Sequence, residues 1–438
     1  MPQNILVINP PHATDSLIRT RLRQPISLLY IVSILEKEFG FTVDFHDLSV
    51  DPLLTPVENS YTCLIITSTP LDRWETPYLD YHDCIKTIDS IKTTYHGMRV
   101  ILTGAHGTIT PDLLFQQSPY IDIIVRGEPE DTIRDIFNGQ PLHTVKGISY
   151  RANSEITHNP LRDNHVDLDS LPMPAYHKID IHKYEYNDSE ILPKPFTIME
   201  TSRGCPHACV FCNKSMHGNR YRYRHAKNVV DEIQYLQDNF AIRSIYFQDL
   251  EFALVRKKVA DFCSELKERN IELNWACAAR CSDIDEDLII QMRDSGCRRI
   301  SFGLESLSNS ILTVIKKKET VSGIRKARSL CQKYGIDFNP FTLVGFPGET
   351  TKTIRESLIN SILLNIPISS TKVRAYPDTK LWDLGVSEGK IDITKSPWEQ
   401  SKITLGRIGN DGSYQRKPLS IKFLRLIKKV QDRICKND

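Results

Sequence analysis

Short apolar segments alternate with amphipathic segments along the first 140 residues of the chain. The segment 26–39 has apolar residues at helical spacing and is followed by Gly40, a residue that favours the end of a helix. A second helix is expected to end near residue 137. Five apolar runs have the length of buried strands, at residues 4–9, 42–45, 64–67, 100–103 and 121–125. Because strands that alternate with helices form parallel sheets with right-handed crossovers, this region predicts an α/β domain.

The same alternation returns after residue 195 and continues to about residue 375. Six segments are predicted as strands, at 196–199, 242–247, 272–277, 298–302, 338–344 and 371–375. Helices are predicted at 255–269, 287–294, 323–334 and 353–364. Six strand–helix units indicate an open, partial (β/α)6 barrel of the TIM type, in which active residues lie at the carboxyl ends of the strands.

Two further stretches differ in composition. Residues 139–195 are rich in Pro, Asp, Asn and His, and they predict a hairpin, with 147–150 pairing with 155–158, and then an extended linker. The end of the chain is polar and then carries a basic amphipathic helix at 419–434, which we expect to close the fold; attachment to a membrane surface is the alternative. The predicted organisation is a first domain at 1–140, a linker at 141–195, a barrel at 196–382 and a small helical tail at 383–438.

The composition is that of an ordinary globular protein, with 40% hydrophobic residues, 25% charged residues and a formal net charge of +2. This balance gives no reason to expect bulk attraction to nucleic acid or to membranes. No apolar run approaches the roughly 18 residues of a membrane span, and no secretory signal precedes the first strand. Since the eleven cysteines are an odd number, we expect reduced thiols and a cytoplasmic protein.

The strongest chemical signal is a loop with three cysteines, Cys205, Cys209 and Cys212, directly after the strand at 196–199. Thiolates are soft ligands that select zinc, copper or iron–sulfur clusters. A structural zinc site needs four ligands, and no fourth Cys or His follows at a zinc-finger offset, although His207 lies inside the loop. Three ligands around four irons leave one iron open for catalysis. Three reduced cysteines in a turn are the alternative, and the other eight cysteines are expected to be small buried residues.

Further candidates follow the predicted strands, at the carboxyl ends where parallel α/β sheets bind their ligands. In the first domain these candidates are Asn9, Pro10, Thr67, Ser68, Gly104, His106, Gly127 and Glu128. In the barrel they are Asp249, Glu251, Arg280, Glu305 and the segment 345–349. Gly104 and Gly107 allow a bulky ligand to come close to the backbone, although tight turns would also explain them. Each carboxylate has an alternative role as a helix cap or a surface ion pair.

The sequence ETSRGCPHACVFCNK at 200–214 resembles the signature of the radical S-adenosylmethionine (radical SAM) enzymes. This resemblance implies that Cys205, Cys209 and Cys212 bind a four-iron four-sulfur cluster. It also implies that S-adenosylmethionine chelates the open iron through its amino and carboxylate groups. Phe211 matches the position at which the family contacts the adenine.

Later motifs are similar to those of the same family over nearly the whole barrel, to about residue 382. QDLEF, WACAAR and FGLES match, and the resemblance implies polar contacts to the methionine or ribose of S-adenosylmethionine around the last of these. GFPGET matches the glycine-rich step beside the adenine, and AYPDTKLW follows the last-strand pattern with Asp378 in place of the usual glycine. The cofactor-binding positions that these motifs imply are Asp249, Arg280, Gly303, Glu305, Gly345, Pro347 and Gly348.

In the first domain, the segments NPP, GAHGT and VRGE resemble, in this order, the cobalamin-binding Rossmann-like domain that precedes the radical domain in one large radical SAM class. There are two departures from that pattern. DYHDCI at 80–85 begins like the lower-ligand motif DxHxxG, but Ile85 replaces the glycine, so His82 is expected on the surface of a helix. In the loop 70–77, Trp74 either lines a ligand pocket or anchors the loop.

These resemblances imply a cytoplasmic, cobalamin-dependent radical SAM enzyme that cleaves S-adenosylmethionine and functionalises an unactivated carbon, which we expect it to methylate. The substrate would be a small molecule or a natural product, and an external donor such as flavodoxin or ferredoxin would supply electrons. The cofactors would be the four-iron four-sulfur cluster, S-adenosylmethionine and cobalamin. Cyclisation or rearrangement without methyl transfer is one alternative, and a non-enzymatic metal- or corrinoid-binding module is another.

Two other functions are disfavoured. A methylthiotransferase would carry a site of three cysteines in its first domain, where this chain has only Cys63 and Cys84. Its tail would resemble a small RNA-binding barrel, whereas the tail of this chain is expected to end in a helix. The segment 221–224, YRYR, interleaves aromatic and basic residues as some nucleic-acid-binding surfaces do. Because the net charge is near neutral, we expect a structural or substrate-facing loop and no nucleic-acid partner.

Overall fold

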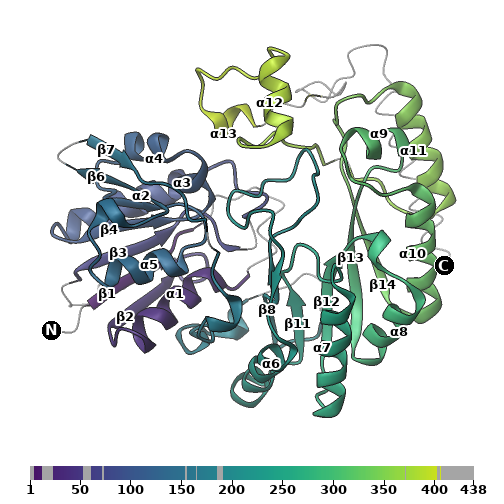
Figure 1. Ribbon diagram of the computed structural model, residues 1–438, viewed down its shortest axis with the longest axis horizontal. Coiled ribbons are helices and arrows are strands. Elements are labelled where there is room, and N and C mark those ends of the chain that lie inside the picture. The colour runs from purple at the N-terminus through teal and green to yellow at the C-terminus, as the bar shows by residue number, and fades with distance from the viewer. Residues whose placement is uncertain are drawn as a thin grey trace. The chain divides into compact units, whose positions relative to one another are not determined.

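The computed structural model describes residues 4–11, 23–52, 61–71, 74–152, 155–163, 165–184, 191–369, 371–401 and 405. The chain forms two compact units (Figure 1). The first unit comprises Met1–Cys205 and Asn213–Gln248, and the second comprises Pro206–Cys212 and Asp249–Asp438. The boundary between the two units therefore runs through the loop of three cysteines.

The first unit is built on a seven-stranded sheet in the order β2-β1-β3-β4-β5-β6-β7 (Figure 1). Strands β1 to β5 pair in parallel, and the β6–β7 hairpin continues the sheet in antiparallel pairing. The strands are β1 Asn4–Asn9, β2 Thr42–Asp47, β3 Cys63–Thr67, β4 Arg99–Thr103, β5 Ile123–Val125, β6 Ile148–Ala152 and β7 Glu155–His158. The five strands predicted from apolar runs are confirmed, and the predicted hairpin forms and extends the sheet.

Five helices accompany this sheet: α1 Ile26–Lys37, α2 His82–Thr94, α3 Ala105–Ile109, α4 Pro111–Gln117 and α5 Glu130–Phe137. Helix α1 is buried from Ile26 to Leu35, because apolar or small residues occupy every position of that stretch rather than one face only. Its side chains pack in one core with those of the strands, including Val7, Ile65 and Ile101. This core fixes the carboxyl ends of the parallel strands, from which the candidate ligand loops start.

The rest of the first unit leads into and out of the cysteine loop. Strands β8 (Phe196–Met199) and β11 (Ser244–Phe247) pair in parallel, and β9 (Ser202–Arg203) pairs antiparallel with β10 (Arg222–Tyr223). Helix α6 (Ala226–Phe240) connects β10 with β11, and 3-10 turns lie at Leu142–Thr144, Leu168–Ser170, Tyr176–Lys178 and Ile181–Lys183. Because β9 and β10 pair, the chain that enters the loop and the chain that leaves it are held side by side.

The second unit contains the parallel strands β12 (Asn274–Ala279), β13 (Cys297–Glu305) and β14 (Asp337–Thr342), with β13 in the middle. Its helices are α7 Arg256–Glu268, α8 Glu286–Asp294, α9 Asn309–Val314, α10 Val321–Tyr334, α11 Thr351–Leu363, α12 Lys380–Ser387 and α13 Pro397–Gln400, with a 3-10 turn at Cys281–Asp283. The strand predicted at 371–375 is wrong, since the described residues there form only an isolated bridge between Val344 and Lys372. Pro377 follows closely and has no N–H to donate, which limits how far such pairing extends.

Among the described residues, no helix combines the length and the apolar character that crossing a membrane requires. The tail begins with the short helices α12 and α13. The basic helix expected at 419–434 lies outside the described residues.

Candidate cofactor site

The cysteine loop starts at a tightly held base in the first unit. Cys205 is buried, its backbone N–H donates to the carbonyl of Gly218 at 3.4 Å, and its own carbonyl accepts from Lys214 Nζ at 2.8 Å. Gly204 has a φ of +81°, and a Cβ at this position would overlap the carbonyl oxygen of Arg220. Only glycine therefore fits where the two sides of the loop meet.

Cys209 and Cys212 belong to the second unit and are both partly exposed. They lie on a turn in which the N–H of Cys212 donates to the carbonyl of Cys209 at 3.4 Å. The turn is anchored between them, because Val210 donates its N–H to the carbonyl of Ile315 at 3.1 Å and accepts from the N–H of Leu381 at 2.8 Å. The two thiols are thus held on a fixed turn and remain accessible, as ligands of a cluster must be.

Arg280, one of the predicted site residues, is buried next to Cys209 in the second unit. Its guanidinium donates to the carbonyl of Lys317. Burial lowers the pKa of Arg280, but the charges of Glu319, Glu251 and Cys209 outweigh this effect and raise it. A permanent cation beside the sulfur suits a cysteine that binds metal as its thiolate.

Glu251 and Glu305 share a buried environment with Lys317 in the second unit. Glu305 Oε1 lies 3.5 Å from Lys317 Nζ. Burial raises the pKa of Glu251 to about 8, against the opposing charges of Lys317 and Arg280. Burial also raises the pKa of Glu305, again against the opposing charge of Lys317. Titratable groups perturbed in this way, by desolvation together with specific charge partners, are typical of functional sites.

The backbone at Glu305 departs from a regular strand. Glu305 has a φ of +63°, and the register between β13 and β14 shifts between Gly303 and Glu305. A residue other than glycine in this region stores strain on the order of 1–3 kcal/mol, and such residues cluster at active sites and ligand clamps. A Cβ at Gly303 would lie 2.6 Å from Glu305 Oε1 and 3.2 Å from Lys317 Nζ. Glycine at 303 therefore leaves the room that the carboxylate and the ammonium group occupy.

The predicted adenine-contacting residues come together in the second unit. The segment 345–349, which includes Pro347, follows β14, and its two glycines, Gly345 and Gly348, both have positive φ. Glu349 Oε2 accepts from the N–H of Gly345 at 2.9 Å and so closes the turn. Within the segment Phe346 is completely buried, and its ring centroid lies 5.5 Å from that of Phe211.

Asp249 is buried against a cation. Its Oδ2 accepts from Lys258 Nζ at 2.6 Å, and that ammonium group lies 4.3 Å from the centroid of the Phe252 ring. Burial lowers the pKa of Lys258, although the charge of Asp249 opposes this. The ion pair considered as an alternative for Asp249 is therefore present, but it lies in the interior rather than at the surface.

In the first unit, the loops after β3 and β4 touch each other. Gly104 has a φ of +102°, and a Cβ there would lie within 2.9 Å of Thr67 Oγ1, Ser68 Oγ and the backbone nitrogen of Thr69. Thr67 Oγ1 donates to the carbonyl of Thr69 at 2.7 Å, and Ser68 Oγ donates to the carbonyl of Thr103 at 3.2 Å. The structure thus brings Thr67, Ser68 and Gly104 together, in a contact between the two loops that is itself buried.

Two other predicted residues of the first unit face the end of β2. Asn9 Nδ2 donates to Asp47 Oδ1 at 2.8 Å, and the carbonyl of Pro10 accepts from Ser49 Oγ at 3.1 Å. His106 is completely buried in α3, where its Nε2 lies 2.8 Å from the carbonyl of Tyr78. These residues are therefore not part of the group formed by Thr67, Ser68 and Gly104.

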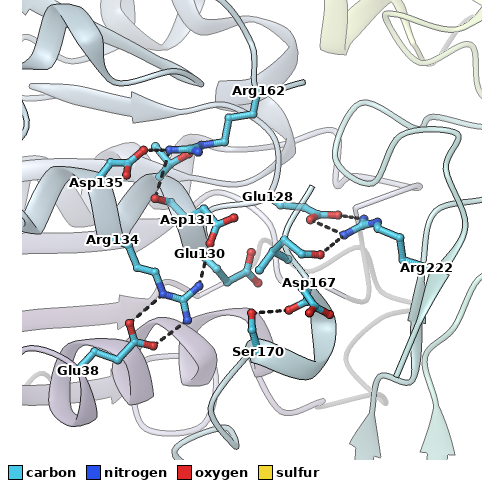
Figure 2. A network of polar contacts seen from close by, with 12 residues as sticks. Glu38, Glu128, Glu130, Asp131, Arg134, Asp135, Arg162, Asp167, Ser170 and Arg222 are labelled. Carbon is cyan, nitrogen blue, oxygen red and sulfur yellow. Dashed lines mark hydrogen bonds and ion pairs between the residues drawn. The ribbon is translucent and has the colours of Figure 1, made fainter. Parts of the chain in front are cut away.

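The loop after β5 contributes Gly127 and Glu128. The N–H of Gly127 donates to Thr108 Oγ1 at 3.0 Å, which ties this loop to the segment after β4. Glu128 is buried and forms an ion pair with Arg222 (Figure 2). Burial raises the pKa of Glu128, but His217, Arg203 and Arg222 outweigh burial and lower it to about 2. Glu128 thus belongs to a group of charged side chains of both signs.

Sequence reasoning missed most of that group, which consists of Glu75, Glu130, Glu200, Arg203 and His217. The available signal was local, because Glu200 and Arg203 lie within the cysteine signature and Glu130 follows Glu128 at a spacing of two. Charged residues in an otherwise apolar, strand-like segment must be paired when they are buried. Apart from the pair of Glu200 and Arg203, which are three residues apart, their partners lie far away in the sequence.

The structure also decides between the alternatives for three other residues. Trp74 anchors its loop, since it is buried and its Nε1 donates to the carbonyl of Thr69 at 3.3 Å. His82 lies at the exposed start of α2, as predicted, and pairs with Asp80 at 2.7 Å. Within 221–224, Arg222 points inward to Glu128, which supports the structural interpretation of that loop.

Residues 199–358 match the Radical SAM superfamily. Over 402 residues the chain is 27% identical to an uncharacterized methyltransferase from Pyrococcus horikoshii, a match that covers 88% of this chain and 84% of the relative. Over 282 residues it is 29% identical to the anaerobic magnesium-protoporphyrin IX monomethyl ester cyclase of Rubrivivax gelatinosus, with 62% of this chain and 50% of that relative covered. The chain therefore spans half the length of the cyclase.

Among solved structures, the radical S-adenosylmethionine methyltransferase TsrM from Kitasatospora setae, determined with cobalamin and a 4Fe-4S cluster bound, has a TM-score of 0.69. The sequence identity is 20%, and the match covers 89% of this chain and 75% of that chain. This likeness shows the fold, an α/β architecture with parallel sheets. The three cysteines lie within residues 199–358, the part of the chain that matches the Radical SAM superfamily, so this part is a radical SAM domain.

Proposed function

We propose that this chain is a cobalamin-dependent radical SAM enzyme that methylates an unactivated carbon of a small molecule or natural product. One observation carries the proposal: a single chain combines a CxxxCxxC loop with a preceding parallel sheet whose ligand-side loops are GAHGT after β4 and VRGE after β5. A relative that matches over most of both chains is named as an uncharacterized methyltransferase, and a neighbour in fold was solved with cobalamin and a cluster.

The residues present fit a cluster and S-adenosylmethionine. Cys205, Cys209 and Cys212 are soft donors in the required number, and two of them are accessible on an anchored turn. The carboxylate of Glu305 can accept hydrogen bonds from an ammonium group, and the guanidinium of Arg280 can donate to a carboxylate, so together they suit an amino-acid moiety. When bound, these cofactors supply the one-electron and radical chemistry that side chains do not provide.

The aromatic and acidic side chains around this site have their own roles. Phe211, which is partly exposed and packs on the buried ring of Phe346, offers an apolar face on which a purine ring can pack. Burial raises the pKa of the Glu251 carboxyl to about 8, which favours its protonated form beside Glu305. A neutral carboxyl can donate a hydrogen bond as well as accept one, and we assign Glu251 this role beside the amino-acid moiety of S-adenosylmethionine.

The first unit fits a bulky cofactor that lies over the ends of its parallel strands. Thr67, Ser68 and Gly104 pack together at these ends in a buried polar cluster, in which Gly104 has no room for a side chain. His82 is directed to solvent-exposed Asp80 at the start of α2, so we propose that cobalamin binds without His82 as a ligand. Every described cysteine is a free thiol, which fits the cytoplasm and a donor such as flavodoxin or ferredoxin.

A second candidate is cyclisation or rearrangement without methyl transfer. Matches to anaerobic magnesium-protoporphyrin IX monomethyl ester cyclases favour it, and they cover 62% of this chain for the Rubrivivax gelatinosus protein and 76% for the Synechocystis protein. The match to the Pyrococcus horikoshii methyltransferase covers 88%. We therefore rank methylation first.

The proposal is tested by purifying the chain without oxygen from cells that are supplied with cobalamin. We expect the absorption spectrum of the folded protein to show a bound corrinoid, with iron and sulfide in amounts that correspond to one cluster. The Cys209→Ser variant should lose iron and keep the corrinoid, because the two cofactors occupy separate sites. Wild-type protein that holds the cluster and no corrinoid would refute the methylase proposal and leave a radical enzyme without cobalamin.

A further inference from the structure

A group of buried charges in the first unit is centred on Arg203, two residues before Cys205. The side chain of Arg203 is completely buried. Its Nε donates to Glu200 Oε2 at 2.7 Å, its Nη2 donates to Glu130 Oε1 at 2.8 Å, and its Nη1 lies 3.7 Å from Glu128 Oε2. One guanidinium therefore joins the base of the cysteine loop to two carboxylates of the loop after β5 and the start of α5.

His217, on the returning side of the cysteine loop, makes a second connection. Its Nε2 lies 3.0 Å from Glu75 Oε1, and its Nδ1 lies 3.7 Å from Glu128 Oε1. Burial lowers the pKa of His217, but Glu128 and Glu75 outweigh burial and raise it to about 9. The imidazole is therefore a cation at neutral pH, and its ring lies 4.8 Å from that of Trp74.

Arg222 in β10 makes the third connection (Figure 2). Its Nη1 donates to Glu128 Oε2 at 3.0 Å and to the carbonyl of Val166 at 2.8 Å. Glu128 thus receives Arg203 from the chain that enters the cysteine loop, and Arg222 and His217 from the chain that leaves it. Both sides of the loop are fastened to the same carboxylate of the first domain.

Such a group of charges is better suited to fixing a geometry than to raising stability. Desolvation of buried charges offsets most of their mutual attraction, and apolar residues of similar volume often stabilise a protein equally well. Arginine, in contrast, presents its donors in a rigid planar fork, so three carboxylates around one guanidinium define an orientation as well as a distance. Two cofactors that act on one substrate carbon must be held at a defined distance and orientation, because a misplacement of about 1 Å can reduce a rate about 100-fold.

We propose that Arg203, Glu128 and Glu130 are positioning residues that set the distance between the cluster and the cobalamin, by fixing the base of the cysteine loop against the cobalamin-binding loops. This inference rests on the proposed function, since it requires both cofactors. None of the three residues needs to touch a cofactor in order to act in this way.

The variant Glu130→Gln tests the proposal, because it keeps the size of the side chain and removes the charge that Arg203 contacts. The matched control is Glu38→Gln, which removes the carboxylate that accepts from Arg134 at 2.7 Å and 2.9 Å elsewhere in the same domain (Figure 2). Both proteins are loaded with cluster and cobalamin, and pulsed electron paramagnetic resonance then measures the distance between the reduced cluster and paramagnetic cobalt.

We expect both variants to bind iron and cobalt as the wild type does. In Glu130→Gln the distribution of distances between the cluster and cobalt should be about twofold broader, or shifted. In Glu38→Gln it should be the same as in the wild type. A general loss of stability would not change this distance. Arg222→Lys keeps the positive charge and removes the planar guanidinium group, so it should show the same change. This variant replaces Glu130→Gln in the test if Glu130→Gln does not fold. A wild-type distribution in Glu130→Gln or, where that variant does not fold, in Arg222→Lys would overturn the inference. Wild-type protein that binds no cobalamin would instead overturn the proposed function.

Discussion

Arg203 Nη2 lies 2.8 Å from Glu130 Oε1, and both side chains are completely buried. The two residues are 73 positions apart, one in the strand that enters the cysteine loop and the other at the start of α5. The segment that carries Cys205 is therefore packed against the first domain as part of one unit.

His217 should make the stability of the protein depend on pH. Its pKa of about 9 in the folded chain lies above the usual 6.5, so the folded state binds the proton more tightly than the unfolded state. The resulting stabilisation is complete below pH 6.5 and is lost as the pH rises through 9. The difference between the two values corresponds to an upper limit of about 3 kcal/mol. We expect the Tm of the wild type to fall across this window.

The variant His217→Gln should have a lower Tm at pH 6.5 and a smaller decrease toward pH 9. His82→Gln is the control, because His82 is an exposed residue that pairs with Asp80. The carboxylate of Glu128 acts in the opposite direction, since its low pKa stabilises the fold above pH 4.5 and this contribution is lost as the pH falls through 2. Parallel pH profiles for His217→Gln and the wild type would show that His217 is not the titrating group.

Gly104→Ala should destabilise the first unit and weaken cobalamin binding. The new Cβ would meet three atoms of the segment 67–69 within 2.9 Å, on a backbone with a φ of +102°. We expect a loss of about 3 kcal/mol and about a tenfold weaker affinity for cobalamin. Gly139→Ala is the matched control, because Gly139 has a φ of +76° and no atom within 4 Å of the added Cβ, so it should cost only about 1 kcal/mol. Thermal denaturation and a corrinoid titration measure both effects, and equal losses in the two variants would contradict this account of the loop.

Asp249→Ala should leave the ammonium group of Lys258 buried without its carboxylate, which costs about 3–5 kcal/mol. The double variant Asp249→Ala/Lys258→Met should recover most of that stability, because it removes both charges and fills the space. Denaturant titrations of the two single variants and the double variant provide the comparison. If the double variant were as unstable as Asp249→Ala, the pairing with Lys258 would not explain the burial of Asp249.

Glu305→Gln should weaken the binding of S-adenosylmethionine about tenfold and leave the iron content unchanged. The carboxylate is held by Lys317 at the end of β13 and is not a ligand of the cluster in the proposed site. Calorimetric titration of the reconstituted protein measures the affinity, and Glu286→Gln, a change on an exposed carboxylate, is the control. An unchanged affinity in Glu305→Gln would remove Glu305 from the cofactor site.

The strands of the first domain could be predicted because their signal is local. Each of β1, β3 and β4 is an uninterrupted apolar run that is buried on both faces, and such runs need no knowledge of the partner strand. Helix α6 could also have been predicted, since Val229, Ile233 and Leu236 recur at helical spacing. It was not among the helices expected from the sequence. The segment 371–375 failed for the opposite reason, because its pairing depends on a neighbouring strand rather than on its own composition.

The residues of the candidate site could likewise be predicted only where their signal is local. The three cysteines are recognisable by their spacing alone, whereas the contact between Phe211 and Phe346 is seen only in the folded chain. The ion pair between Arg203 and Glu130 is not predictable in this way, because the two residues lie 73 positions apart in the sequence. The positive φ of Glu305 is likewise a consequence of the register shift beside β14, which only the folded chain reveals.

The measurement that tests the central claim most directly is the formation of 5′-deoxyadenosine from S-adenosylmethionine by the anaerobically reconstituted protein under a strong reductant. We predict that the wild type forms 5′-deoxyadenosine, and that Cys212→Ala, which lacks one of the three thiols, forms none. Wild-type protein that carries a complete cluster and forms no 5′-deoxyadenosine would contradict the claim that Cys205, Cys209 and Cys212 hold a catalytic cluster.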